Sequence, residues 1–271
     1  MSSLFPKVPS MSRKSRFKAS GANDALFAGV CLAAIAVFGL ASHARAQAVD
    51  PTTAQNPSQS VAASWSPDVA FNLAVGSDYV FRGVSQTEED PALSGGVDLT
   101  FGQGYVGAWA STVSFPGDGD TDAEIDLYGG VRPEVAGFTL DLGVVGYLYT
   151  NQPDGADYSY GEVKLAASRA VGPATLGAAV YWSPDFFGAS EDEATYVEAN
   201  AAFSPADRWT VSGAVGRQFV SSDFDYTTWN AGVTYALTET LGLDVRYSDT
   251  DEHEFGDIYG ARAFASLKAV F

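Results

Sequence analysis

The side chains of this chain that could do chemistry are charged groups that alternate with apolar residues along short segments. If these segments surround a water-filled space, opposed acids and bases could orient and pass small polar solutes. The residues predicted to line that space are Asp78, Arg82, Asp98, Glu124, Asp126, Tyr128, Arg132, Asp141, Glu162, Lys164, Glu198, Asp244, Arg246, Arg262 and Lys268. Because both signs occur, two interpretations stay open: rows of charge that create a transverse field, or charges that pair across a partly blocked interior.

Arg82 has two possible roles. It follows Tyr79 and Phe81 at the end of the first alternating segment. Its guanidinium could bind a carboxylate or phosphate on a solute. Alternatively, it could tie the acidic segment 87–90 to the rim by a local ion pair.

Catalytic and metal chemistry have little support. His253 lies among acidic residues that could orient it as the general base of a hydrolase, but no Ser or Cys is marked as its nucleophile. The run Asp118–Asp122 resembles the start of a calcium loop, yet Ala123 and Gly129 stand where an EF-hand requires Gly and Glu. One Cys in 271 residues and a formal net charge of −18 argue against a thiolate cluster and a nucleic-acid partner. We predict no catalytic residue, metal or cofactor.

The elements that must position these charges are β-strands. Apolar residues recur with period two from Val69 to Phe271, in about twelve segments, without a helical stripe over three turns. The opposite face carries small residues and scattered charges, which suit a confined lumen better than the surface of a soluble sandwich. The predicted fold is therefore all-β, a transmembrane antiparallel up-and-down barrel. Aromatic residues near strand ends are expected to form interfacial girdles: Tyr79, Phe81, Tyr105, Phe115, Phe138, Tyr149, Trp182, Phe203, Trp209, Phe219, Tyr247 and Phe271.

Connections between the segments alternate between long and short. The long ones hold nineteen acidic residues and no Lys or Arg. Short periplasmic turns and long extracellular loops are typical of outer-membrane barrels. The chain ends on Phe271 in an alternating strand, which predicts recognition by the barrel-assembly machinery. Arg217 breaks the alternation by pointing outward, so we expect it near the rim.

The N-terminus predicts export. Basic residues precede an apolar stretch over 25–41 and small-residue sites that end at Ala46 and Ala48, so residues 1–48 are predicted to be a cleaved signal peptide. The alternative is an N-terminal membrane anchor. Residues 49–66 are rich in Pro, Ser and Gln and predict a flexible tether, which leaves 67–271 as the barrel.

Several motifs resemble one known family. The segments Ser77–Gln86, Glu124–Gly130, Tyr160–Val163, Ser183–Gly188 and Leu267–Phe271 together resemble the proteobacterial TorF-type porin family, and the resemblance covers nearly all of 67–271. It implies an outer-membrane barrel with a porin role and supplies no established substrate or catalytic residue.

The expected function is passive diffusion of small hydrophilic solutes or ions across the bacterial outer membrane, with outer-membrane lipid as the surrounding partner. The acidic mouth favours cations. The alternatives are a non-conducting structural or adhesive barrel with acidic loops and, less supported, a hydrolase that uses His253.

Overall fold

The fold is a closed antiparallel β-barrel. A computed structural model describes residues 67–188 and 193–271, so the predicted signal peptide and tether lie outside the described residues. The twelve long strands are β1 (Asp68–Gly76), β4 (Ala92–Phe101), β5 (Gly104–Thr112), β6 (Ala123–Val131), β8 (Phe138–Tyr149), β9 (Tyr160–Val171), β10 (Ala174–Ser183), β11 (Ala194–Ala206), β12 (Trp209–Phe219), β13 (Tyr226–Ala236), β14 (Leu241–Thr250) and β15 (Arg262–Val270). The all-β, twelve-stranded prediction is confirmed.

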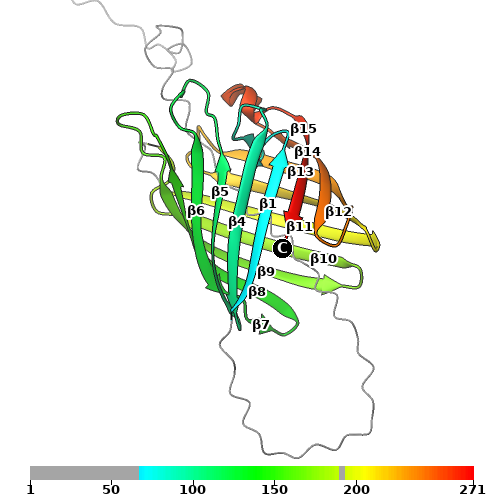
Figure 1. Cartoon of the computed structure of the whole chain (residues 1–271). Coiled ribbons are helices and arrows are strands. Elements are labelled where there is room, and N and C mark those ends of the chain that lie inside the picture. Colours follow the sequence, from blue (N-terminus) through cyan, green and yellow to red (C-terminus); the bar gives the residue numbers. More distant parts are fainter. Residues whose placement is uncertain (1–66, 189–192) are drawn as a thin grey trace, which may run out of the picture.

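Pairing of the first and last strands closes the barrel. β1 pairs with β15 on one side and with β4 on the other, and β6 pairs with β8, so every long strand has two neighbours. Figure 1 shows the first strand, in cyan, beside the last, in red. Closure satisfies the backbone hydrogen bonds of all twelve strands, as a lipid environment requires.

The remaining elements are short. They are β2 (Val80–Phe81), β3 (Val84–Ser85), β7 (Glu134–Val135) and two 3-10 turns, η3 (His253–Phe255) and η4 (Asp257–Tyr259). Among the described residues, no helix has the length and apolar character needed to cross a membrane.

The two ends of the barrel differ. We call the loop end the one that carries segments 77–91, 113–122, 150–159, 220–225 and 251–261, and the turn end the one with 102–103, 132–137, 172–173, 207–208 and 237–240. Strands run alternately toward each end, as the predicted order of long and short connections requires. Figure 1 shows the long segments gathered at the top of the barrel.

The outer face of the barrel is apolar. Leu73, Leu127 and Val144 are 53%, 52% and 58% exposed, although a soluble protein would bury such side chains. Their strand neighbours point inward and are largely buried: Asp126 beside Leu127 and Val145 beside Val144 are examples. Apolar-out and polar-in alternation is the pattern of a barrel that faces lipid.

The girdle prediction is wrong for five aromatic residues. Tyr79, Phe81, Tyr105, Phe115 and Tyr149 lie inside the barrel or its loops, whereas the other seven are outward or terminal. The physical reason is that inward tyrosines find carboxylate partners: the Tyr105 hydroxyl donates to Asp141 at 2.7 Å and that of Tyr149 to Glu124 at 2.5 Å.

Arg217 lies close to its expected position. It sits near the loop end of β12, where its guanidinium is 3.8 Å from the Asp225 carboxylate and donates a hydrogen bond to Thr227 at 2.9 Å. These partners hold the charge at the rim, where an outward arginine costs little.

Candidate functional site in the barrel interior

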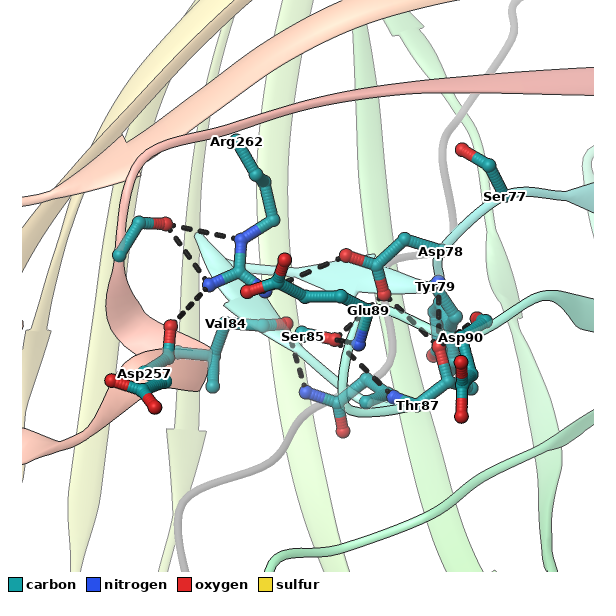
Figure 2. Close-up of polar contacts among 12 residues, drawn as sticks. Ser77, Asp78, Tyr79, Val84, Ser85, Thr87, Glu89, Asp90, Asp257 and Arg262 are labelled. Atoms are coloured by element: carbon teal, nitrogen blue, oxygen red, sulfur yellow. Dashed lines mark hydrogen bonds and ion pairs between the residues drawn. The ribbon is translucent and has the colours of Figure 1, made fainter.

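A loop fills the loop-end half of the barrel. We call residues 77–91, between β1 and β4, the plug; it contains the small hairpin β2–β3. Phe81, Val84, Ser85 and Gln86 are 3%, 0%, 0% and 0% exposed. Burial this complete, in a segment between two strands at the loop end, means that the chain turns back into the barrel instead of projecting from it (Figure 2).

The contacts of the plug reach strands all around the barrel. The Tyr79 hydroxyl donates to Glu124 on β6, Arg82 contacts Glu162 on β9 and Gln218 on β12, and Asp78 contacts Arg262 on β15. The backbone amide of Ser114, in the β5–β6 connection, donates to the Gln86 carbonyl at 2.8 Å. Only a segment near the barrel axis can contact such widely separated walls.

A tight turn places Arg82 at the tip of the plug. Val80 pairs with Ser85 and Phe81 with Val84, so Arg82 and Gly83 are the two central residues. Their φ values are +43° and +89°, and positive φ at both positions is typical of the type I′ turn that joins two-residue hairpins. A Cβ on Gly83 would overlap the side chains of Thr228 and Thr250.

Arg82 forms the central ion pair. Its two terminal nitrogens lie 3.0 and 2.8 Å from the two carboxylate oxygens of Glu162, and Nη1 also donates to Gln218 at 3.0 Å. The guanidinium lies over the rings of Tyr196 and Tyr181, 4.2 and 4.8 Å from their centroids. Burial disfavours the charge, but Glu162 together with Tyr147 and Tyr160 raises the pKa of Arg82 above its usual value, so the guanidinium stays charged.

This pairing corrects one interpretation of Arg82. A local ion pair with segment 87–90 was one of the two roles considered, but the partner is Glu162, far along the chain on the opposite wall. Arginine suits this position because its planar guanidinium matches a carboxylate with two parallel hydrogen bonds.

A second arginine anchors the base of the plug. Figure 2 shows Arg262 extending from β15 toward Asp78 and Glu89, with Nη1 3.5 and 3.7 Å from their carboxylates. The other carboxylate oxygen of Asp78 accepts hydrogen bonds from Ser85 at 2.6 Å and Thr87 at 3.0 Å. Asp78 therefore links the start of the plug, its returning strand and the barrel wall.

One wall beside the plug is acidic. Glu124 accepts hydrogen bonds from the Tyr79 and Tyr149 hydroxyls at 3.0 and 2.5 Å, and Glu162 accepts one from Tyr147 at 3.1 Å. Both carboxylate oxygens of Asp126 are buried and have no hydrogen-bond partner among the described residues. Burial, Glu124 and Asp126 raise the pKa of Tyr79 well above its usual value, so its hydroxyl remains a donor.

Paired charges line the turn-end half, where Asp141 and Lys164 are buried and Arg132 is partly exposed. Asp141 accepts from Lys164 at 2.7 Å, Arg132 at 3.2 Å and Tyr105 at 2.7 Å. Arg132 remains 41% exposed and stacks on the Tyr105 ring at 3.8 Å. These groups form a polar vestibule below the plug.

A second cluster lies on the opposite wall of that vestibule. Arg246 is 3.1 Å from Asp244 and donates to Asn230 at 2.6 Å and to Ser212 at 2.9 Å. Two other vestibule carboxylates are held by neutral donors: Glu198 on β11 by Tyr196 at 3.0 Å and Asn200 at 2.9 Å, and Asp98, on the side of the first cluster, by Tyr128 at 2.7 Å. Lys268 is half-buried on β15.

The predicted lining residues thus fall into two groups. The plug region contains Asp78, Arg82, Glu124, Asp126, Glu162 and Arg262, all buried. The vestibule contains Asp98, Tyr128, Arg132, Asp141, Lys164, Glu198, Asp244, Arg246 and Lys268. Of the two sequence interpretations, charge pairing describes the interior, but not between opposite walls. The pairs Arg82–Glu162 and Arg262–Asp78 join the plug to the wall. Arg132 and Lys164 pair with Asp141 on the neighbouring strand β8, and Arg246 pairs with Asp244 on its own strand.

Sequence reasoning missed the neutral partners. Gln218, Asn230 and Ser212 bind the guanidinium groups, and Thr228 and Thr250 receive the plug tip. One signal in the sequence was the apolar run Tyr79–Phe81 followed by Arg82, Gly83 and Val84. Apolar residues on both sides of a two-residue turn indicate a buried hairpin and not a solvated acidic loop.

Aromatic side chains pack at the loop end. Phe115 contacts Tyr149, Tyr158 and Phe187, and the Tyr158 and Phe187 rings stack with centroids 4.6 Å apart. Tyr147 and Tyr160 stack in the same way at 4.4 Å. This packing adjoins the acidic wall, because Tyr149 and Tyr147 also donate hydrogen bonds to Glu124 and Glu162.

His253 forms a pair without a nucleophile. Its Nε2 lies 2.7 Å from the Asp249 carboxylate, and the Tyr247 hydroxyl donates to the other oxygen of Asp249 at 2.8 Å. Of the described residues, no Ser or Thr hydroxyl contacts the His253 ring.

The acidic loops use their carboxylates locally. Asp118 accepts from the Thr121 hydroxyl at 2.6 Å and from the Asp120 amide at 2.9 Å, and Asp122 accepts from Thr150 at 2.6 Å. The described part of the chain contains no group of three His, Cys, Asp or Glu residues arranged to hold a metal ion.

Sequence comparison identifies the family. The family described as bacterial protein of unknown function (Gcw_chp) matches residues 61–270. The chain belongs to this family. The TorF-type name stays a prediction, because the description of Gcw_chp proteins assigns no function. No curated protein matches the chain in sequence.

Solved structures similar to this Gcw_chp chain include a porin and an outer-membrane channel. The KdgM porin has a TM-score of 0.51 and 8% identity, and the alignment covers 74% of this chain and 99% of that one. KdgM in complex with disordered oligogalacturonate has a TM-score of 0.51 and 6% identity, and the alignment covers 75% of this chain and 97% of that one. An outer-membrane channel of Pseudomonas putida F1 has a TM-score of 0.46 and 11% identity, and the alignment covers 74% of this chain and 94% of that one. At 6 to 8% identity, the likeness to KdgM shows a shared barrel fold.

Proposed function

We propose that this protein is an outer-membrane channel for passive diffusion of small hydrophilic solutes or ions, and that the plug closes it in the state described. The observation that carries the proposal is the contrast between the two faces of one closed barrel. Leu73 and Val144 are exposed outside, whereas Asp126, Glu162 and Lys164 lie inside. Lipid accounts for the first face and a hydrated passage for the second.

The vestibule supports diffusion without a chemical step. The vestibule charges named above are paired or hydrogen-bonded, and Arg132 remains partly exposed. Within the described residues the passage is therefore polar, without an unpaired charge to retain a solute. Across the fifteen predicted lining residues, eight are acidic and six basic, and exposed acids Glu88, Glu89 and Asp90 add to the loop end. Both features favour cations.

A non-conducting structural barrel is the second candidate, and the buried plug favours it. The two candidates differ in what happens when the plug is removed. If the plug is a gate, replacement of residues 79–89 with a short Gly-Ser turn opens a continuous polar passage. If the barrel is structural, the interior collapses or stays closed.

Planar-bilayer recording separates the candidates. The chain as its host processes it, recovered from the outer-membrane fraction, is compared with the plug-shortened variant and with a variant of equal truncation in segment 150–159. We expect small or rare current steps from the wild type, larger steps from the plug-shortened variant and wild-type behaviour from the control. Inserted protein that gives no current in either the wild type or the plug-shortened form would overturn the channel proposal.

A further inference from the structure

An arginine faces outward near the turn end of β9. Val163, Leu165, Ala167, Arg169 and Val171 share the outer face of this strand, and Arg169 is exposed three residues before the 172–173 turn. Its guanidinium lies 5.1 Å from the ring centroid of Phe138 on β8. Among the described residues, no carboxylate lies within ion-pair distance of Arg169.

Arg169 lies at the depth in the membrane where lipid phosphate groups are found. An arginine that faces lipid is costly at the bilayer midplane and nearly free at the interface. A position close to the turn end places it at the headgroup layer of the leaflet on that side. Stacking on Phe138 holds the guanidinium against the wall, and no carboxylate of the described residues occupies its donors.

An apolar groove lies farther into the membrane on the same strands. It is open and shallow, has a volume of about 440 Å³ and crosses β6, β8 and β9. The lining residues that face outward are Gly129, Leu142, Val144, Val163 and Leu165. Gly129 faces outward between the larger side chains Leu127 and Val131, so the absence of its side chain helps to form the groove. Leu142 pairs with Leu165 and Val144 with Val163 across its floor.

The separation of the arginine and the groove matches a phospholipid. Leu165 is four residues from Arg169, about 13 Å along a strand and about 10 Å along the membrane normal at the usual strand tilt. The headgroup layer is only about 5 to 8 Å thick, so the groove lies at the depth of the acyl chains. Ala167 lies between Leu165 and Arg169 on the outer face of β9, and its small side chain leaves room for a lipid chain between the groove and the guanidinium.

We propose that Arg169 and this groove bind one phospholipid molecule of the membrane leaflet at the turn end, with its phosphate on the guanidinium and one acyl chain in the groove. The inference rests on the membrane location in the proposed function, but not on conduction. It assigns a lipid site to the outer wall of β8 and β9, apart from the barrel interior.

Native mass spectrometry of the full, host-processed protein in detergent tests this proposal. The probe is palmitoyl-oleoyl phosphatidylglycerol, titrated onto delipidated protein. Arg169→Gln removes the charge, and Val144→Trp fills the groove from an exposed outer position. Matched controls are Arg208→Gln, at another turn on the same end, and Val245→Trp, at an exposed outer position on β14.

We expect Arg169→Gln and Val144→Trp each to weaken lipid binding about tenfold, and each control to stay within about twofold of wild type. Equal binding by wild type and Arg169→Gln would overturn the site. Unchanged binding by Val144→Trp would overturn the acyl-chain assignment. If glycerol phosphate displaces the lipid at the same concentration, the site binds soluble phosphate and the lipid proposal fails.

Failure of this inference is distinguishable from failure of the proposed function. Inserted barrels that carry no current contradict the channel but leave the lipid titration interpretable. Protein that is absent from the outer-membrane fraction contradicts the membrane location itself, and the lipid site falls with it. A conducting protein whose Arg169→Gln variant binds lipid normally contradicts the lipid site alone.

Discussion

Arg82 and Glu162 form a buried ion pair in which each charge depends on the other. Removing one partner of such a pair leaves an uncompensated buried charge and costs about 3 to 5 kcal/mol, whereas replacing both with apolar residues of similar size is often nearly neutral. We therefore expect Glu162→Gln to lower the free energy of unfolding by about 3 kcal/mol, and Arg82→Met combined with Glu162→Leu to recover most of it. Urea unfolding in lipid vesicles measures both.

The same variants separate stability from gating. The double variant restores packing but removes the charged contact between plug and wall, so we expect wild-type-like unfolding with more frequent current steps. A double variant as unstable as Glu162→Gln would show that the packing of Arg82 on aromatic rings and its hydrogen bond to the Gln218 side-chain oxygen matter more than the ion pair.

Gly83 is the residue on which the plug tip depends. Gly83→Ala must adopt a φ near +89° and also overlaps Thr228 and Thr250. Gly117 has a similar φ of +77° but open space around it, so Gly117→Ala is the matched control. We expect a loss of about 1 kcal/mol for the control and about 2 to 3 kcal/mol for Gly83→Ala. Equal losses of stability in Gly83→Ala and Gly117→Ala would mean that the plug tip can move away from Thr228 and Thr250 at little cost.

At the scale of elements, the strands were predictable and the plug was not. Alternation fixes which residues of β8 and β9 face lipid, because a shift of one residue would put Asp141 and Lys164 into it. The same rule failed on β5, where Tyr105 and Trp109 appear apolar but face inward. The outward positions are held by the smaller Val106, Ala108 and Ala110. Residue type alone does not distinguish a lipid-facing aromatic from one that packs beside a plug.

The plug escaped prediction because its partners are distant in sequence. Arg82 meets Glu162 and Gln218 across 80 and 136 positions, and Arg262 meets Asp78 across 184. Nothing in a single sequence specifies such pairings, although alternation correctly predicted the inward direction of Glu162 and Arg262. The acids and bases of the interior were thus predictable as a set, and their pairings were not.

The loop 113–122 offers a pH test at this scale. Burial would raise the pKa of Asp118, but hydrogen bonds from the Thr121 hydroxyl and from the amides of Asp120 and Thr121 lower it below its usual value. A lowered pKa means that the stabilisation is present above the unfolded-state pKa, about 3.9, and is lost as pH falls through the folded one.

We expect amide exchange at Asp120 and Thr121 to be slow at pH 6 and to accelerate, after correction for intrinsic rates, as the pH falls below about 4. Asp118→Ala should show the fast behaviour at every pH. From the part of the chain that the structure describes, Asp223 in the 220–225 connection accepts only a long side-chain hydrogen bond from Ser222, at 3.5 Å, so Asp223→Ala is the control. Protection at Thr121 that does not change between pH 6 and pH 3 would show that the carboxylate does not order this loop.

At the scale of the whole molecule, two populations of acid act on a permeating ion. Glu88, Glu89 and Asp90 are exposed at the loop end, whereas Asp98 lies in the vestibule with Tyr128 as its hydrogen-bond partner. Salt screens exposed charges more than enclosed ones: the Debye length falls from about 10 Å at 0.1 M to about 3 Å at 1 M. The dependence of selectivity on salt therefore reports which population dominates.

We expect the plug-shortened variant, which lacks Glu88 and Glu89, to retain a cation-selective reversal potential that weakens only moderately as salt rises, because the vestibule acids are enclosed. Asp98→Asn in that background should shift the reversal potential toward zero, while Asp90→Asn should shift it only at low salt. A reversal potential of zero in the shortened variant, together with cation selectivity in wild type, would place selectivity in the exposed acids of the loop end. The interior charges would then serve the structure of the barrel and not its permeation.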